Sequence, residues 1–342
     1  SVRARVQPPF PSAPSSQRSA HCLFSLNMGW CQKIAMQLAF MPVAWFALVW
    51  WQQDSMIYRP RLYNKPLDQK SWLDQGMNVT ELRFAGGEDG EQVALLVWPR
   101  QSSEPARQLY AVFGGNAMFA RDWLNVLSHH RNADWNSAAF VLVDFPGFGF
   151  SSGTPCEASI GRAARRALSE ARAALLAEDA GAEPLLGVIG HSIGCAAALK
   201  LAADGEPGAS QIRHLVLSSP FSSIPAIAQE MLPPLRVLPL SVLSFFAGRN
   251  AWDNLAAAGR IAAVCVETEG STCDAQARVR VDIIHSTEDE MCPFSHGQEL
   301  AERFRRSGVQ VHFTPSVGGH NEILFSSEFG EWLRHAMKQA SA

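Results

Sequence analysis

The stretch that decides the fold reads Leu185-Leu186-Gly187-Val188-Ile189-Gly190-His191-Ser192-Ile193-Gly194. Its first five residues are apolar or small, which is typical of a strand buried on both faces of a parallel sheet. The residues that follow Gly194 are small, apolar and helix-forming. A serine between two glycines therefore stands where a buried strand turns sharply into a helix. A turn this tight strains the serine backbone and requires small neighbours, which Gly190 and Gly194 supply.

A serine in this position is a candidate nucleophile. Its hydroxyl is a weak nucleophile at neutral pH and needs a base to take its proton, and the base needs a carboxylate to hold its tautomer. The turn lifts the Ser192 oxygen clear of the sheet, and the backbone N–H of Ile193 at the helix start can donate to an oxyanion.

The rest of the chain alternates predicted strands with predicted helices. Residues 79–84 and 92–98 flank a glycine-rich turn and predict a β-hairpin. Further buried strands are predicted at residues 109–113, 138–143, 212–217, 279–284 and 309–314, with helices at 118–130, 154–177, 295–307 and 321–338. This alternation predicts an α/β fold with a mostly parallel, doubly wound sheet. Residues 222–258 interrupt it with several prolines and short helical pieces, and we interpret them as a small helical lid.

The acid and the base are expected on loops at the carboxyl edge of the sheet, in the chain order serine, acid, histidine. Asp289 follows the predicted strand 279–284 and is the candidate acid, with Glu288 and Glu290 as neighbouring alternatives. His320 follows the last predicted strand, after two glycines, and is the candidate base. His191 adjoins the serine, and its side chain is expected to turn away.

A second oxyanion donor is expected in the loop after the strand 109–113. That loop reads Gly114-Gly115-Asn116-Ala117, and the backbone N–H of Asn116 or Ala117 would face the oxyanion beside that of Ile193. A tight strand–helix turn would also account for the glycines. No metal or cofactor is needed for this chemistry, and none is predicted.

The N-terminal part has a different composition. Residues 1–33 begin with a stretch rich in proline, serine and arginine, and we predict a disordered or targeting extension. Residues 34–51 carry no charge and end in Trp50 and Trp51, which favours a membrane-anchor helix at the lower limit of spanning length. A cleaved signal peptide and a helix docked on the globular domain are the alternatives.

Net charge and cysteine content restrict the partners. The formal net charge of −3 gives no reason to expect binding to nucleic acid. The seven cysteines show no zinc-binding spacing. Cys265 and Cys273 bracket a short polar segment and would pair in an oxidising compartment or remain as two thiols in a reducing one.

From about residue 56 to 338 the chain resembles the α/β-hydrolase superfamily, in its serine-aminopeptidase-like branch. It is similar in particular to membrane-anchored members that include protein depalmitoylases and bud-emergence-type hydrolases. The matching pieces are Gly115-Asn116-Ala117, Asp144-Phe145-Pro146-Gly147-Phe148-Gly149, Gly190–Gly194, Ser219-Pro220-Phe221, Asp253-Asn254, Asp289-Glu290, Pro293-Phe294-Ser295-His296-Gly297 and Gly319-His320-Asn321. Two departures are Gly114, where the family usually has histidine, and residues 265–278, which look like an insertion.

The resemblance implies an α/β-hydrolase fold and an esterase or thioesterase acting on acylated proteins or lipids. The expected enzyme is a membrane-associated serine hydrolase with the triad Ser192, Asp289 and His320 and an oxyanion hole from Ile193 and Asn116 or Ala117. A serine peptidase or a lysophospholipase is an alternative enzyme. A non-catalytic binding scaffold on the same fold is an alternative of another class, since fold alone does not fix function.

Overall fold

A computed structural model describes residues 50–99, 106–130, 138–178, 183–204, 212–267 and 279–340, together with Met41, Ala44, Ala47 and Leu48. The chain divides into two units, Ser1–Ala47 and Leu48–Ala342, and the sheet and its helices belong to the second. The predicted extension at residues 1–33 lies outside the described residues, as does most of the predicted anchor helix at 34–51. Within the described part, no helix has both the length and the apolar character needed to cross a bilayer.

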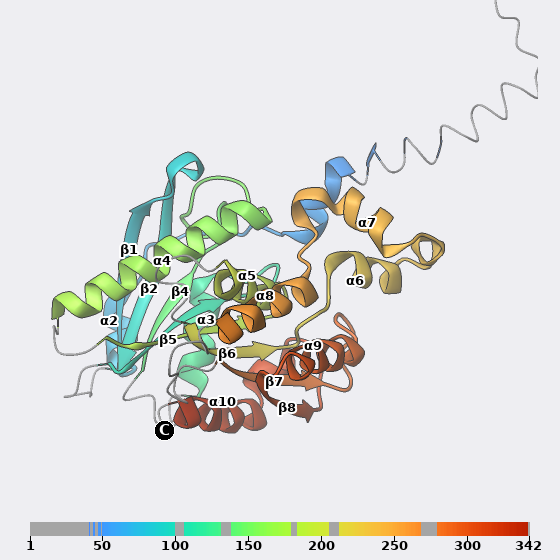
Figure 1. Ribbon diagram of the computed structural model, residues 1–342. Helices are drawn as coiled ribbons and strands as arrows, with labels where there is room; N and C mark the ends of the chain where they lie inside the picture. Colours follow the sequence, from blue (N-terminus) through green and yellow to red (C-terminus); the bar gives the residue numbers. More distant parts are fainter. Residues whose placement is uncertain are drawn as a thin grey trace, which may run out of the picture. The chain divides into compact units, whose positions relative to one another are not determined.

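One mixed sheet forms the centre of the second unit (Figure 1). Its first two strands are an antiparallel hairpin, β2 pairs antiparallel with β4, and every later pairing is parallel. This agrees with the predicted hairpin start and mostly parallel sheet. The strands, given in their spatial order, are β1 (Met77–Ala85), β2 (Glu91–Pro99), β4 (Ala138–Val143), β3 (Gln108–Phe113), β5 (Leu185–His191), β6 (Ile212–Ser218), β7 (Arg280–Ser286) and β8 (Gln310–Ser316).

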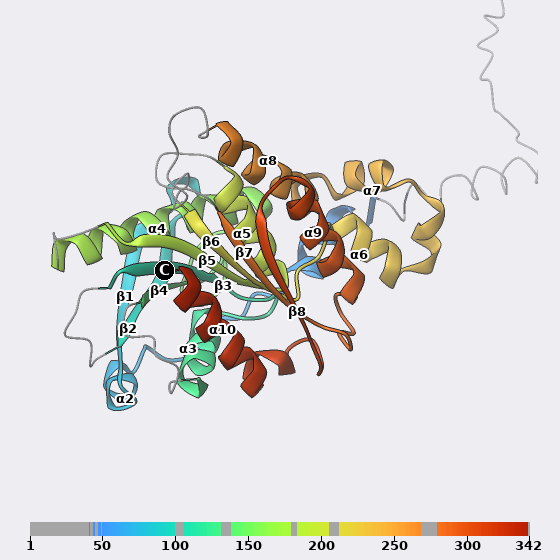
Figure 2. The same ribbon diagram turned by 60° about the horizontal axis from the view of Figure 1, so that its bottom comes forward.

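Helices cover both faces of the sheet, and each face has its own apolar core. Figure 2 shows α3 (Ala120–His129) and α10 (Ser327–Ala340) together on one face of the sheet. The short helix α2 (Gln69–Asp74) lies beside β1. The remaining sheet-covering helices are α3 (Ala120–His129) and α10 (Ser327–Ala340) on the first face, and α4 (Glu157–Glu178), α5 (Ile193–Ala203), α8 (Asn254–Glu267) and α9 (Phe294–Arg306) on the second.

A helical insertion separates β6 from α8. It consists of α6 (Ile224–Met231), the 3₁₀ turn η3 (Pro233–Val237), α7 (Leu240–Ala247) and the 3₁₀ turn η4 (Gly248–Asn250). The sequence predicted a lid over residues 222–258. The insertion ends earlier because α8, which packs on α5 and α9, begins at Asn254. Cys265 is in α8, and its possible partner Cys273 lies outside the described residues.

The C-terminal helix differs from the prediction. Instead of one helix over 321–338, the structure has a 3₁₀ turn η7 (Glu322–Phe325) followed by α10. The backbone of Ser326 between them is extended, and its hydroxyl accepts a hydrogen bond from Phe329 N at 3.1 Å. A serine that caps a following helix in this way stops the preceding turn from continuing into it.

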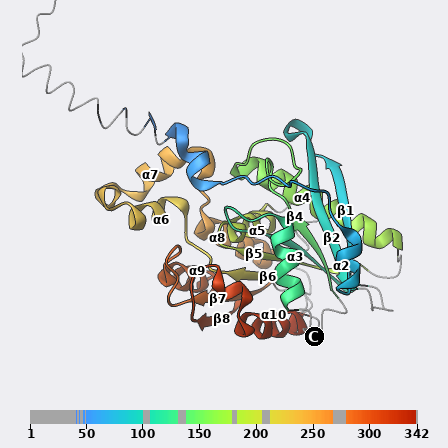
Figure 3. The same ribbon diagram turned by 180° about the vertical axis from the view of Figure 1, so that it is seen from behind.

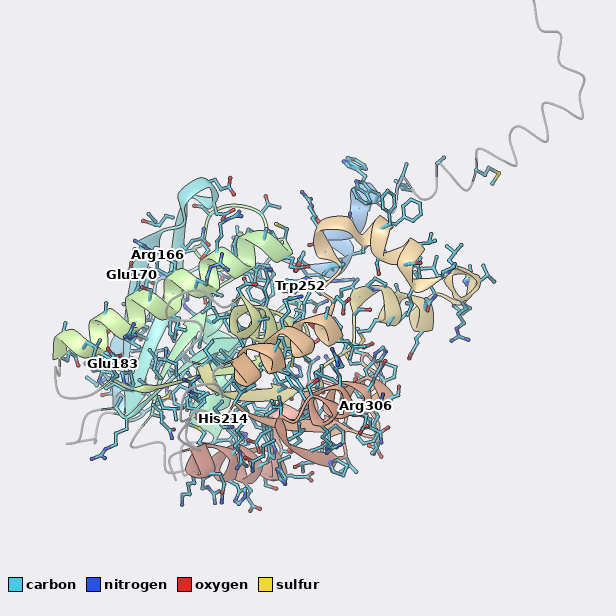
Figure 4. The ribbon with its side chains drawn as sticks, viewed as in Figure 1. Arg166, Glu170, Glu183, His214, Trp252 and Arg306 are labelled. Atoms are coloured by element: carbon cyan, nitrogen blue, oxygen red, sulfur yellow. The ribbon has the colours of Figure 1, made fainter. Side chains whose placement is uncertain are left out.

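A buried polar network crosses the sheet between β3 and β7. Tyr110 Oη donates to His214 Nδ1 at 2.8 Å, and His214 Nε2 donates to Asp282 Oδ2 at 2.8 Å. Asp282 also accepts two hydrogen bonds from Arg280. The tyrosine ring reaches His214 (labelled in Figure 4) across Gly187 of β5, where a Cβ atom would collide with the ring. Each polar group of this buried chain therefore has a partner.

The network ties folding stability to pH. Burial lowers the pKa of His214, although its hydrogen bond to Asp282 opposes this effect. Burial raises the pKa of Asp282, but hydrogen bonds from His214 and Arg280 outweigh it and hold that pKa below its ordinary range. In the unfolded chain the histidine takes up a proton below about pH 6.5 and the carboxylate below about pH 3.9.

We predict that the free energy of unfolding decreases as the pH falls below about 6.5, because His214 binds a proton in the unfolded state but stays neutral in the folded state. His214→Gln keeps a donor and an acceptor but cannot be charged. It should flatten the dependence of unfolding free energy on pH below about pH 6.5, by up to about 1.4 kcal/mol per pH unit. Urea unfolding at several pH values measures this, and an unchanged slope would contradict it.

Candidate active site

Ser192 occupies the tight turn between β5 and α5. Its backbone has φ 56° and ψ −124°, in the left-handed region that side chains rarely adopt. A Cβ on Gly190 would lie 2.5 Å from Gly194 O, and one on Gly194 would collide with the carbonyl of Phe113 in β3. The two glycines therefore let the helix start directly over the strand ends, as predicted from the sequence.

Asp289 and His320 meet at the same edge of the sheet. Asp289 follows β7 and His320 follows β8, and His320 Nδ1 lies 2.8 and 2.9 Å from the two carboxylate oxygens. The Asp289 carboxylate is fully buried, and it also accepts hydrogen bonds from the backbone N–H groups of Met291 and Cys292. With its Nδ1–H donated to Asp289, His320 has Nε2 left to accept a proton.

The electrostatics of Asp289 favour its charged form. Burial raises the pKa of this carboxyl, but hydrogen bonds from His285 and His320, together with the charge of His320, hold it well below its usual range. His285 Nε2 lies 3.5 Å from Asp289 Oδ2 and 2.8 Å from the carbonyl oxygen of Cys292. The carboxylate therefore stays ionised and can stabilise a positive charge on His320.

The carboxylates of Glu288, Glu290 and Glu322 bind backbone groups instead of the imidazole. Glu288 Oε2 accepts a hydrogen bond from Gly318 N at 3.1 Å, and Glu290 Oε2 accepts one from His320 N at 3.0 Å. Glu322 Oε2 holds Gly319 N at 3.2 Å. The two sequence alternatives for the acid thus bind the backbone of the histidine loop, while Asp289 contacts the imidazole.

The His191 side chain was expected to turn away from the site, but in the structure it lies beside His320. Its ring centre is 4.8 Å from that of His320, with an angle of 39° between the planes. The ring is fully buried, with Nδ1 3.2 Å from Ser218 Oγ and Nε2 3.2 Å from Asn321 Oδ1. Burial and the neighbouring His320 lower the pKa of His191 to about 3. His191 is therefore a neutral ring packed beside His320, in contact with the last residue of β6 and with the loop that follows β8.

Ser192 has neighbours on both sides of this edge. Its Cβ lies 3.7 Å from the position of a Cβ on Gly115, and its side chain offsets part of the rise that burial causes in the pKa of the Cys292 thiol. The hydrogen bonds of the described residues do not include one between Ser192 and His320. Catalytic hydrogen bonds are often long in a ligand-free site and shorten when substrate binds.

The loop 114–117 is held from behind by the chain that enters the globular unit. Arg59 N donates to the carbonyl of Asn116 at 2.9 Å, and Arg61 Nη1 donates to the carbonyl of Ala117 at 3.2 Å. Arg59 and Arg61 thus give the loop a support that the sequence did not reveal. Within the loop, Gly115 lies beside Ser192, and the role of Asn116, Ala117 and Ile193 as oxyanion donors stays a prediction.

The described residues include no group of three or more histidine, cysteine or acidic side chains placed to hold a metal ion. Cys156, Cys195 and Cys292 are free thiols, and the last two are buried.

Comparison with known proteins places the chain in a family. The alpha/beta hydrolase family model matches residues 112–329. Among curated relatives, the uncharacterized protein YfhR of Salmonella typhi is 26% identical over 225 residues, a match that covers 62% of this chain and 66% of the relative. The YfhR protein of Salmonella typhimurium matches over the same shares.

Solved structures share the fold at low sequence identity. An esterase from Pyrococcus furiosus has a TM-score of 0.56 at 15% identity, with 84% of this chain and 98% of that chain covered. Carboxyl esterase 2 of the fungus Tuber melanosporum has a TM-score of 0.53 at 16% identity, covering 83% and 91%. The acylaminoacyl peptidase of Pyrococcus horikoshii has a TM-score of 0.52 at 12% identity, covering 80% and 43%. The family model spans well over half of the sequence, and the chain belongs to the alpha/beta hydrolase family.

Proposed function

We propose that the chain is a serine hydrolase that cleaves an ester or thioester through an acyl-enzyme on Ser192. The observation that carries the proposal is the 2.8 Å contact between His320 Nδ1 and a buried, ionised Asp289, at the sheet edge where Ser192 occupies a left-handed turn. Serine, histidine and carboxylate on loops after three parallel strands are the parts that acyl transfer requires.

The proposed reaction has two halves. Ser192 Oγ attacks the acyl carbonyl while His320 Nε2 takes the hydroxyl proton, and His320 then returns that proton to the leaving alcohol or thiol. Water next attacks the acyl-enzyme with His320 as base, which releases the carboxylic acid and restores Ser192. Asp289 holds the imidazole tautomer and stabilises its positive charge in both halves.

The oxyanion of each tetrahedral intermediate needs preorganised donors. We assign this role to the backbone N–H groups of Ile193 and of Asn116 or Ala117. The support for the second donor is that Gly115 lies beside Ser192 and that Arg59 and Arg61 bind the carbonyls of this loop, which fixes the orientation of its peptides. Loss of one such donor commonly costs about 10²–10³ in turnover.

The substrate class we propose is an acylated protein or a lipid, with the enzyme associated with a membrane through residues 34–51. Support comes from the sequence resemblance and from the uncharged character of that segment. A serine peptidase or a lysophospholipase would use the same triad, and a non-catalytic scaffold would use only the fold. The experiments below separate these possibilities.

Fluorophosphonate labelling tests whether the serine is activated. We expect wild-type protein to be labelled and both Ser192→Ala and His320→Ala to lose the label, because the reagent needs a nucleophile and its base. Ser219→Ala is a matched control, since Ser219 is a buried serine with φ 52° at the end of the neighbouring strand β6. This control should still be labelled. A folded wild-type protein that takes no label would favour the scaffold.

The acid assignment is tested by two variants of neighbouring carboxylates. Asp289→Asn should lower kcat by about 10⁴, because the amide cannot hold the productive tautomer of His320. Glu290→Gln keeps an oxygen that can accept from His320 N, and we expect it to lower kcat by less than about tenfold. Steady-state kinetics on a soluble ester measures both, and a larger loss in Glu290→Gln would transfer the role of acid to Glu290.

A substrate panel tests the leaving group and the acyl chain. Thioester and oxyester pairs with the same acyl chain, at short and long lengths, are compared with an N-acyl amino acid amide. We expect kcat/KM to rise with acyl length and the amide to be the poorest substrate. A preference for the amide would support the peptidase, and a preference for short chains would contradict an acylated protein or lipid as substrate.

A further inference from the structure

The helical insertion exposes large apolar side chains. Val237 in η3 is 83% exposed and Phe245 in α7 is 77% exposed. Leu240 on α7 and two residues at the end of α6 add to them, and we call the set of Met231, Leu232, Val237, Leu240 and Phe245 the lid face. Five exposed large apolar side chains within 15 residues of one insertion point to a binding surface, because soluble proteins rarely gather such side chains on a free surface.

The composition of the insertion narrows the choice of partner. From residue 231 to 247 the sequence contains one charged side chain, Arg236, and no acid, and the charged residues on either side of this segment, Glu230 and Arg249, are paired with His296 and Asp54. A specific protein interface normally has a polar rim with charges that set orientation, and this segment offers almost none. Apolar side chains with a single basic residue instead suit the acyl chains and anionic headgroups of a lipid bilayer.

A second apolar element is fixed to the same insertion. The helical residues 50–57 expose Trp50, Trp51 and Met56, and Figures 1 and 3 show this helix beside α7. The Trp50 ring packs against Gly248, the residue that follows α7. The two tryptophans therefore come from an element that adjoins the lid face.

Polar contacts hold the two elements together. Asp54 forms an ion pair with Arg249 and accepts a hydrogen bond from Asn250 Nδ2 at 2.6 Å. Tyr58 Oη donates to Asn250 Oδ1 at 3.0 Å and accepts from Trp252 Nε1 at 2.7 Å. Trp252, labelled in Figure 4, is buried at the base of the insertion. Residues 50–58 thus brace the insertion through side chains that are far apart in sequence.

The chain reaches this helix from a segment with no charge at all. Residues 34–49 contain no acidic or basic side chain and run directly into Trp50 and Trp51. Tryptophan is enriched where a membrane protein crosses the headgroup region. A bilayer that receives residues 34–49 therefore meets the protein at the helix to which the insertion is attached.

We propose that the lid face, together with Trp50 and Trp51, binds the surface of a lipid bilayer. The insertion follows β6 directly, and Ser218 at the end of that strand contacts His191, the residue before Ser192. The membrane contact is separate from the ester chemistry, because it needs neither Ser192 nor His320.

Photocrosslinking to lipid tests the proposal on the full chain. The protein is reconstituted in phosphatidylcholine and phosphatidylglycerol vesicles that contain a phosphatidylcholine with a diazirine in its acyl chain. After irradiation, peptide mass spectrometry locates the lipid adducts. We expect adducts in peptides covering residues 231–247 and 50–57 of the wild-type protein.

Two variants separate the lid face from the rest of the surface. Val237→Ser combined with Phe245→Ser should lose the adducts on residues 231–247, while adducts in peptides covering residues 50–57 persist. Leu62→Ser is the matched control, because Leu62 is 70% exposed but lies outside the insertion. Its adduct pattern should equal that of the wild type.

Three outcomes would overturn the proposal. The first is adducts on vesicle-bound wild-type protein that spare residues 231–247, which would mean that the lid face meets water. The second is an adduct pattern unchanged by the double substitution. The third is an absence of lipid adducts on residues 231–247 together with a dimer in analytical ultracentrifugation that the double substitution dissociates, which would assign this surface to a second copy. Fluorophosphonate labelling of the same samples reports on Ser192 separately, so the failure of one proposal is distinguishable from that of the other.

Discussion

The left-handed backbone of Ser192 is the constraint on which the rest of the site depends. It requires glycine at positions 190 and 194, because Gly194 lies against the carbonyl of Phe113 in the neighbouring strand. This close approach brings α5 onto β3 and β5, and the buried alanines of α5 allow it to pack tightly there. The serine is then fixed at the carboxyl edge of the sheet, where the loops after β7 and β8 also begin.

Carboxylates at this edge have two separate tasks. Asp289 is buried and contacts the ring of His320, whereas Glu288, Glu290 and Glu322 bind the backbone of residues 318–320. A loop that contains two glycines is flexible by itself, and three acceptors on its amides offset that freedom. The orientation of the His320 imidazole is therefore fixed both by Asp289, which binds the ring, and by the glutamates that bind the backbone of its loop.

The sequence predicted the features that depend on local pattern. Buried apolar runs gave the strands, and the order of Ser192, Asp289 and His320 along the chain gave three residues that the structure brings to one sheet edge. It did not predict the packing of His191 against His320, because a ring orientation depends on partners such as Asn321 that are 130 positions away. The break at Ser326 was missed although its signal was present, since a serine before a helical pattern is a common helix cap.

The other features that the sequence did not predict depend on contacts between residues that are far apart in the chain. Residues 54–61 have two structural roles that no local sequence pattern predicts. Arg59 and Arg61 bind the loop 114–117 behind Ser192, and Asp54 and Tyr58 bind the end of the helical insertion. These four residues lie within eight positions of one another, so a displacement of this short segment would reach both the proposed oxyanion loop and the insertion. Attachment of the preceding segment to a membrane would therefore act on both parts of the site through one stretch of backbone.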